Sequence, residues 1–313
     1  MPSIECAELA RNIELGQPAA VARGITWCEA GGRPADELML SLPVRSAHVV
    51  GITGAAGAGK STLVNWLVKA HRELDRKVAV VAVDPSSPIS GGALLGDRIR
   101  LGKLSGDPDV FFRSLATRGA SGGLADATTA SIQVLSAGGF DPVIVETVGA
   151  GQSEVDVMRV ADTVVVVLTP ESGDEIQALK AGLMEIADIF VLNKSDRPAA
   201  ASMQGHVASL VHMRSDADWV PPIVTTIGLD GTGLPELVEA IDAHRQHFGR
   251  HSTPGDDSTT EQAGVLRAVR ARFDTALHDE AAAIWRLLES GEVDGTEAAR
   301  KLARVVASRL GDG

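Results

Sequence analysis

The stretch GAAGAGKST (residues 54–62) directly follows the apolar run HVVGIT (residues 48–53). Its glycines, lysine and serine fit the spacing G-x-x-x-x-G-K-[ST] of a phosphate-binding loop. A backbone that wraps around a polyphosphate must bring its N–H groups close to anionic oxygens, and glycine or alanine leaves room for that approach. The motif requires a strand before it and a helix after it, and both are indicated here. The stretch therefore predicts a P-loop nucleotide-binding fold, with a plain glycine-rich turn as the alternative.

Two side chains of this loop have specific roles in the prediction. We expect the ammonium group of Lys60 to reach the β- and γ-phosphates, and the hydroxyl group of Ser61 to bind Mg²⁺. The predicted nucleotide-binding segment consists of Gly54, Ala55, Ala56, Gly57, Ala58, Gly59, Lys60, Ser61 and Thr62.

Short aliphatic runs alternate with helical stretches from His48 onward. Runs such as TVVVVL are apolar on both alternating faces, which is typical of parallel strands covered by helices on both sides. The pattern predicts a doubly wound, mainly parallel α/β sheet, in which ligands bind beyond the carboxyl ends of the strands. The seven predicted strands are HVVGIT (48–53), VAVVAVD (78–84), DVFF (109–112), PVIVET (142–147), TVVVVL (163–168), IFVLNK (189–194) and PIVTTI (222–227).

Helical periodicity marks both ends of the chain. We expect an N-terminal helical segment (residues 1–44) of two or three short helices, a nucleotide-binding domain (45–250) and a C-terminal helical hairpin (251–313) after the polar stretch RHSTPGDDSTTEQ. A two-helix hairpin cannot bury its apolar stripe alone, so it must pack on the main domain or on another chain. We expect the second, a homodimer held by residues 260–310, through Val265, Val269, Phe273, Leu277, Ile284, Leu287 and Leu288.

Composition excludes several classes of function. Of the 313 residues, 44% are hydrophobic, which is enough for a sizeable core, and the net charge of −12 argues against a nucleic-acid or anionic-membrane partner. The N-terminus lacks the apolar region of a signal peptide and no apolar run is long enough to span a membrane, so we expect a cytoplasmic protein. Cys6 and Cys28 fit neither a zinc motif nor a redox motif, and two buried thiols are expected.

The stretch NKSD (residues 193–196) matches the guanine-reading element N-K-x-D. Asp196 can accept hydrogen bonds from guanine N1–H and N2–H₂, whereas adenine would leave these acceptors unpaired. Asn193 is expected to brace the surrounding loops, and the aliphatic stem of Lys194 to cover the base. Guanine sites commonly add a Ser-Ala pair after the last strand. Ile227 and Gly228 stand there in this chain, and the backbone N–H of Gly228 is the expected donor to guanine O6.

Three acids follow or end predicted strands and are candidate Mg²⁺ ligands. They are Asp84, Asp97 and Glu146. Mg²⁺ prefers oxygen ligands and retains several waters, so one or two carboxylates suffice. The segment ETVGAGQSE parallels the D-x-x-G switch of GTPases, with Glu146 at the acid and Gly149 placed to donate its N–H to the γ-phosphate. A helix cap or a solvated loop charge is the alternative for each acid.

As a set, VDPSSPISGGALLGDRIRL, ETVGAGQSEVDV and GDEIQALKAGLMEIADIFVLNKSD resemble the MeaB/ArgK-type GTPases, the SIMIBI-type family of the methylmalonic aciduria type A protein. The resemblance covers roughly residues 45–250. It implies a dimeric GTPase that uses GTP/GDP and Mg²⁺ and acts as a chaperone of an adenosylcobalamin-dependent acyl-CoA mutase, chiefly methylmalonyl-CoA mutase. It also implies that Asp84, Asp97 and Glu146 are the metal-site acids and that Lys180 belongs to a mobile switch. Ala55-Ala56, where the family usually has Pro, and the missing Ser-Ala pair are departures.

The rate of hydrolysis is expected to be slow in isolation. Ras-like enzymes place a water-orienting Gln directly after D-x-x-G, but Ala150 occupies that place and Gln152 follows two residues later. Without such a group or an arginine finger, turnover on the order of 10⁻⁴ to 10⁻² per second is typical. The candidate catalytic residues are Lys60, Glu146, Gly149, Gln152 and Lys180.

Two other classes remain open. A nickel-insertion GTPase would carry clustered metal ligands, and the closest cluster, His244, His247 and His251, is expected to be a solvated helix face instead. A small-molecule kinase or transport-associated ATPase would need an acceptor pocket with a base, which no segment indicates. Methylmalonyl-, isobutyryl-, ethylmalonyl- and hydroxyisobutyryl-CoA mutases are the candidate partners.

Overall fold

The computed structural model describes residues 4–43, 45–84, 106–116, 123–147, 160–170, 183–212 and 218–249, together with residues 297, 300 and 301. The chain divides into two compact units, Met1–Thr253 and Pro254–Gly313. The predicted C-terminal hairpin lies outside the described residues, except for an i,i+4 ion pair between Glu297 and Lys301 at 3.6 Å. The fold can therefore be followed in the first unit.

Seven strands form one sheet in the order β3-β2-β4-β1-β5-β6-β7, and every neighbouring pair is parallel. This order confirms the doubly wound α/β fold that the alternating pattern predicts. β1 lies at the centre, between β4 and β5, and the phosphate-loop stretch directly follows it. The strands are β1 (Val49–Gly54), β2 (Val78–Asp84), β3 (Val110–Ala116), β4 (Val143–Thr147), β5 (Thr163–Leu168), β6 (Ile189–Leu192) and β7 (Ile223–Thr225).

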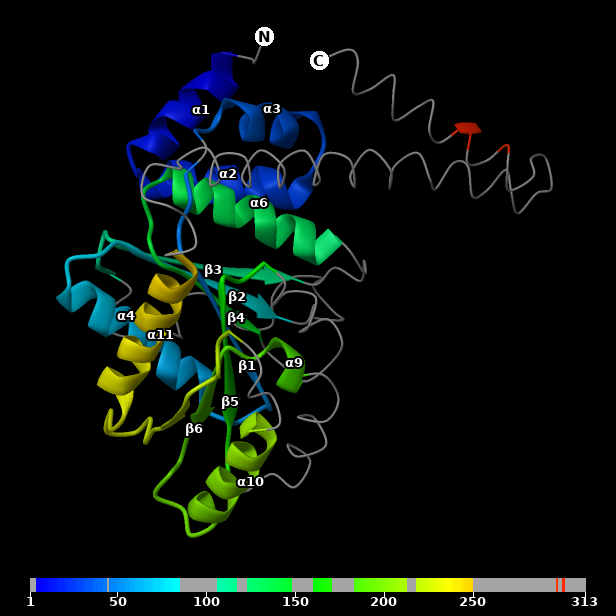
Figure 1. Cartoon of the computed structure of the whole chain (residues 1–313). Coiled ribbons are helices and arrows are strands. Elements are labelled where there is room, and N and C mark those ends of the chain that lie inside the picture. The colour runs from blue at the N-terminus through cyan, green and yellow to red at the C-terminus, as the bar shows by residue number, and fades with distance from the viewer. Residues whose placement is uncertain are drawn as a thin grey trace. The chain divides into compact units, whose positions relative to one another are not determined.

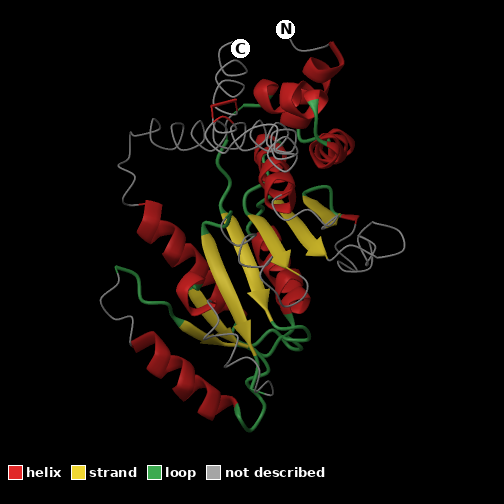
Figure 2. Ribbon diagram, turned by 90° about the vertical axis from the view of Figure 1, so that its right-hand side faces the viewer, coloured by secondary structure: helices red, strands yellow, loops and turns green. Residues whose placement is uncertain are grey.

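Helices cover both faces of the sheet (Figure 2), as the doubly apolar strands predict. In β5, Val164 and Val166 pack into the cluster of one face, whereas Val165 and Val167 pack into the cluster of the other. Because side chains alternate along a strand, a run of valines is buried on both sides at once.

Each face has its own set of helices (Figure 1). The first cluster includes side chains of α1 (Ile4–Glu14), α2 (Pro18–Ala30), α3 (Arg33–Ser41), α6 (Gly123–Ala137) and α10 (Ala200–His212). The second cluster includes side chains of α4 (Lys60–Glu73) and α11 (Leu234–Gly249). A single short turn, α9 (Met184–Ile186), precedes β6.

Three N-terminal helices form an additional layer on α6. Ile13, Val21, Ile25 and Leu38 are almost completely buried in this layer. The layer also encloses both cysteines, which are free thiols, as expected. Burial raises the pKa of the Cys28 thiol to about 12, so it stays protonated and unreactive. None of the described helices is both long and apolar enough to cross a membrane.

Candidate nucleotide-binding site

The candidate site lies where β1 ends, at the carboxyl edge of the sheet. β1 ends at Gly54, the loop follows, and α4 begins at Lys60. β4 and β5 flank β1 on opposite sides, so the loop sits at the point where the chain order reverses. This is the place where open α/β sheets bind their ligands. The N-terminal end of α4 adds backbone N–H groups and a partial positive charge, both favourable for phosphate.

The side chain of Lys60 is held against the phosphate loop. Its side chain is only 6% exposed, and its Nζ donates hydrogen bonds to the carbonyl oxygens of Gly54 (2.5 Å) and Ala55 (3.0 Å). These contacts keep the ammonium group beneath the loop rather than in solvent. A buried cation held by carbonyls at a glycine-rich loop is well placed for an anionic ligand.

Ser61 and Glu146 bring two hard oxygen ligands together. The Ser61 hydroxyl donates to Glu146 Oε1 at 2.5 Å, and Glu146 is only 2% exposed. Mg²⁺ sites of this kind combine one or two protein oxygens with phosphate oxygens and water, and the pair fits that donor set. No group of three or more His, Cys, Asp or Glu residues able to hold a metal occurs in the part of the chain that the structure describes.

The structure describes little or nothing of the other predicted metal-site and switch residues. Asp84 ends β2, and its neighbour in the sheet register is Ala116, but its side chain is not described. Asp97, Gly149, Gln152 and Lys180 lie outside the described residues. Their roles therefore stay predictions from the sequence.

Asn193 joins the phosphate loop to the guanine-reading loops. Its Nδ2 donates to the carbonyl oxygen of Ala58 (2.8 Å), while its Oδ1 accepts from Thr226 Oγ1 (3.1 Å) and from the Gly228 N–H (3.0 Å). Asn193 is 3% exposed, so the amide that braces these loops is buried. One side chain thus fixes three segments that are distant in sequence.

Gly59 makes this close approach possible. Its φ is +93°, in the region that favours glycine, and a Cβ built there would lie 2.3 Å from Asn193 Nδ2. Any larger residue would collide with the bracing amide. The second fixed glycine of the motif is therefore needed for the contact between the two loops as well as for the turn.

The remainder of the NKSD stretch turns outward. Lys194 has a φ of +56°, which is uncommon for a residue with a side chain, and the N–H of Ser195 donates to the Thr226 carbonyl oxygen at 3.1 Å. The Asp196 side chain is half exposed and lies 3.9 Å from Arg197 Nε. An exposed carboxylate beside a rigid turn is the geometry expected for a group that reads a ligand.

Both backbone groups of Gly228 contact side chains of the site. Its N–H, expected to meet guanine O6, donates to Asn193 Oδ1, and its carbonyl oxygen accepts from Trp66 Nε1 at 3.0 Å. Neither Trp66 nor Thr226 was among the residues predicted for the site. A signal for Trp66 was present, because it lies four residues after Thr62 and therefore on the same helix face.

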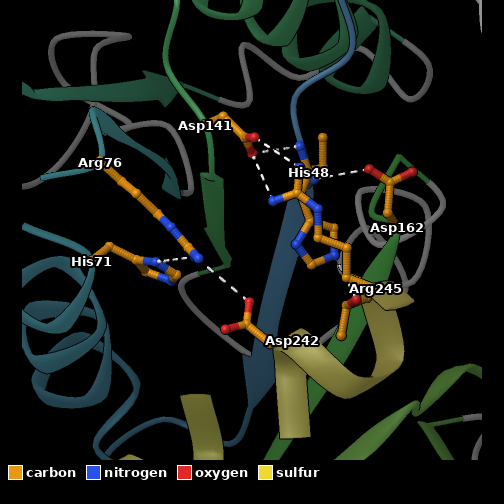
Figure 3. A network of polar contacts seen from close by, with 9 residues as sticks. His48, His71, Arg76, Asp141, Asp162, Asp242 and Arg245 are labelled. Carbon is orange, nitrogen blue, oxygen red and sulfur yellow. Dashed lines mark hydrogen bonds and ion pairs between the residues drawn. The ribbon is translucent and has the colours of Figure 1, made fainter. Parts of the chain in front are cut away.

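A second polar cluster occupies the opposite edge of the sheet, where the strands begin (Figure 3). His48 Nε2 lies 2.8 Å from Thr163 Oγ1, which in turn lies 2.7 Å from His244 Nδ1. His244 Nε2 is 3.3 Å from Asp188 Oδ1, and its ring packs edge-on against Trp219 with centroids 4.9 Å apart. We call this set, with the ion pairs described next, the basal network.

Ion pairs surround these histidines in the basal network. Arg245 donates to both carboxylate oxygens of Asp141, whose Oδ1 also accepts from the backbone N–H of His48. Burial alone would raise the pKa of Asp141, but the hydrogen bonds from Arg245 and His48 lower it overall. Arg76 connects His71 at 3.2 Å to Asp242 at 3.6 Å.

The basal network corrects one expectation from the sequence. His244 is 2% exposed and so does not belong to a solvated helix face, although His251 lies outside the described residues. Burial lowers the pKa of both His48 and His71 to about 4, because a charged imidazole loses its hydration there. His48, His71 and His244 therefore form polar contacts with other side chains of the fold.

Comparisons with known proteins agree with this site. The family described as methylmalonyl Co-A mutase-associated GTPase MeaB matches residues 21–284. A protein of Pyrococcus abyssi is 47% identical over 249 residues, which cover 78% of this chain and 77% of that protein. The mitochondrial methylmalonic aciduria type A homolog of Mus musculus is 39% identical over 197 residues, covering 61% of this chain and 48% of that protein.

One solved structure shares the fold of this chain. The crystal structure of a LAO/AO transport system kinase aligns with a TM-score of 0.68 at 24% identity, covering 98% of this chain and 99% of that one. At that level of identity the likeness concerns the fold alone.

Proposed function

The chain belongs to the MeaB family of methylmalonyl Co-A mutase-associated GTPases, and we therefore propose that it is a chaperone of an adenosylcobalamin-dependent acyl-CoA mutase. It is a GTPase, and its family is associated with methylmalonyl-CoA mutase. In the proposal, GTP binding and hydrolysis gate the loading of the mutase cofactor and protect or reactivate the mutase. The family match over residues 21–284 carries this proposal, and methylmalonyl-CoA mutase is the partner that we favour.

In the proposal, different described residues bind the phosphates, the guanine base and Mg²⁺. Lys60 binds the β- and γ-phosphates from beneath the phosphate loop. The Asn193 side-chain amide fixes the phosphate loop relative to the loop that follows β7, which is expected to face the base. Asp196 accepts from guanine N1–H and N2–H₂. Ser61 and Glu146 would hold Mg²⁺, and the ion would supply positive charge to offset that of the phosphate oxygens.

Slow basal hydrolysis and stimulation by the partner complete the proposal. Gly149 donates to the γ-phosphate, and Asp84 and Asp97 complete the metal site. Gln152 and Lys180 belong to segments that change conformation with the nucleotide state.

The homodimer is built by residues 260–310. Light scattering on a chain truncated near Gly255 tests this part, because a truncated protein that stays dimeric would refute it.

GTP turnover with and without purified methylmalonyl-CoA mutase tests the central proposal. We expect turnover below about 10⁻² per second for the protein alone and a clear increase when the mutase is added. Turnover above about 1 per second for the protein alone would contradict the slow basal state. An unchanged rate over a range of mutase concentrations, with no complex in size-exclusion chromatography, would remove this mutase as the partner.

Two measurements separate the other classes. Equilibrium dialysis with Ni²⁺ should show no stoichiometric binding if the nickel-insertion alternative is wrong. Product analysis should show GDP and free phosphate without a second phosphorylated compound, which a small-molecule kinase would require.

A further inference from the structure

Helix α4 packs one face against the loop that follows β7. Thr62, Trp66 and Lys69 occupy positions i, i+4 and i+7 of that helix and therefore share a face. A Cβ built on Gly228 would lie 3.3 Å from Thr62 Cγ2, and the Trp66 indole N–H donates to the Gly228 carbonyl oxygen at 3.0 Å. The helix that starts at the phosphate loop thus touches the loop expected to face the base.

The Trp66 ring also packs on this loop. A Cβ built on Gly231 would lie 3.1 Å from two carbons of the indole, so the ring and the loop backbone are in close contact. The Lys69 ammonium lies 4.9 Å from the ring centroid, within the range of a cation–π contact. The indole is therefore partly buried between the loop and a lysine, with its N–H aimed at one carbonyl.

The peptide unit between Gly228 and Leu229 is fixed by these contacts. On the preceding side, the Gly228 N–H donates to Asn193 Oδ1 at 3.0 Å. In a planar trans peptide the C=O and the following N–H point in opposite directions. The bond from Trp66 to the Gly228 carbonyl oxygen therefore directs the Leu229 N–H away from α4.

The Leu229 N–H is the available donor of this loop. Within the described ranges it has no hydrogen-bond acceptor, and Leu229 is 93% exposed. The Gly228 N–H, by contrast, is already used by Asn193. A donor that is fixed in direction and open to a ligand suits an acceptor such as guanine O6, because little order has to be gained on binding.

We propose that Trp66 is a positioning residue for guanine recognition, which holds the Gly228–Leu229 peptide so that the Leu229 N–H donates to guanine O6. The inference rests on the proposed placement of the base beside Asn193 and Asp196. It joins the phosphate-binding helix to the base-reading loop through one indole hydrogen bond.

Nucleotide affinities of Trp66→Phe test the proposal. GDP and IDP both carry O6, whereas 2-aminopurine riboside diphosphate lacks it and keeps the same phosphates. We expect Trp66→Phe to weaken GDP and IDP binding by about tenfold, the effect of about one hydrogen bond, and to leave the 2-aminopurine nucleotide within about twofold. In labelled wild-type protein, the Leu229 amide resonance should move with GDP and IDP but not with the 2-aminopurine nucleotide.

Two variants serve as matched controls. Trp219→Phe loses the same kind of bond, from an indole N–H to a backbone carbonyl oxygen at 2.8 Å, but at the opposite edge of the sheet. Lys69→Met removes the cation and leaves the indole bond of Trp66 in place. Both should keep the three affinities within about twofold of the wild type, while thermal melts report any general loss of stability.

The outcomes separate this inference from the proposed site. An equal loss for all three nucleotides in Trp66→Phe, or an unmoved Leu229 amide with GDP, would overturn the role of Trp66. If wild-type protein binds GDP no better than ADP, the base site itself is wrong. If Trp66→Phe does not fold, the Leu229 amide resonance of the wild-type protein decides, because an amide that does not move with GDP would overturn the proposal.

Discussion

The two edges of one parallel sheet are built in opposite ways. At the carboxyl edge, Lys60 and Asn193 bond mainly to backbone atoms of loops, and Asp196 stays half exposed. At the amino edge, Asp141 and Arg245 pair with each other, and three histidines are nearly completely buried. One edge thus keeps side chains poised beside glycine-rich backbone, whereas the other edge binds its side chains to each other.

The contrast separates the residues expected to bind a ligand from the residues that stabilise the fold. A group that is to bind a ligand must keep a donor or acceptor available, so its neighbours fix its position through other atoms. A buried polar group without a ligand must be satisfied within the fold, because an unsatisfied one costs about 1–3 kcal/mol. The edges should therefore respond differently to substitution and to pH.

The largest effect is expected for Lys60→Ala. The variant removes the buried ammonium group at the phosphate loop, and the loss of charge-assisted bonds to phosphate should weaken GTP binding by at least about a hundredfold. Titration calorimetry with GTP measures this. Lys69→Ala on the same helix is the control, because its exposed side chain points to Trp66 rather than to the loop; equal losses in both variants would contradict the assignment.

Asn193→Ala should affect both binding and folding. Three hydrogen bonds of a buried amide are lost together, so we expect the free energy of unfolding to fall by about 2–4 kcal/mol, with weaker binding of every nucleotide. Urea denaturation and GDP titration measure the two effects.

Asp196→Asn is the contrasting variant from the same stretch. Its exposed side chain should leave the free energy of unfolding within about 0.5 kcal/mol, while nucleotide preference moves from GTP toward XTP. Equal binding of ATP and GTP by the wild type would show that the stretch is only a turn.

We expect the free energy of unfolding to fall in acid because of two histidines of the basal network. His48 and His71 have pKa values lowered from 6.5 to about 4, so between these values the unfolded chain binds protons that the folded chain excludes. Their contribution is fully present above about pH 6.5 and falls as the pH drops toward 4, by no more than about 3 kcal/mol for each histidine. Urea denaturation at several pH values measures the slope.

Two histidine variants test which groups cause this pH dependence. His71→Gln should make the decline between pH 6.5 and 4 shallower, because one excluded proton is removed. His206→Gln on the exposed face of α10 should leave the profile unchanged. A profile of the His71 variant with the wild-type slope would show that other groups cause the acid sensitivity.

The smallest effect on stability is expected for Lys180→Ala. An exposed ion pair is worth only about 0–1 kcal/mol, so thermal stability, GTP affinity and basal turnover should barely change. A few kcal/mol of differential contact between nucleotide states suffices to switch a partner, so stimulation by the mutase should be largely lost. Full stimulation in the variant would leave Lys180 as a surface charge.

Periodic patterns in the sequence predicted the sheet well. Runs such as VAVVAVD and TVVVVL specify strands buried on both faces, and the sheet contains all seven predicted strands. The residues of GAAGAGKST and NKSD also predicted which loops meet. These features are local, because strand periodicity and loop spacing are properties of a few consecutive residues.

Other features depended on contacts between distant segments. Gly228 and Trp66 are 162 positions apart, and His48 and Thr163 are 115 apart, so no local pattern indicates their hydrogen bonds. His244 illustrates the limit, since its spacing suggested a solvated helix face and packing against Trp219 buried it. A helix pattern gives the face of a residue but not what covers that face.

Short runs with fixed spacing were enough to predict a parallel sheet, a phosphate loop and a guanine-reading stretch. The folded chain alone shows that the N–H of Gly228 donates to Asn193, that the Trp66 indole donates to the Gly228 carbonyl oxygen, and that polar side chains of the amino edge pair with each other (Figure 3). The physical reason is that hydrogen bonds are short and directional. Their partners are chosen by the three-dimensional packing of strands and helices, which brings together residues that the chain keeps far apart.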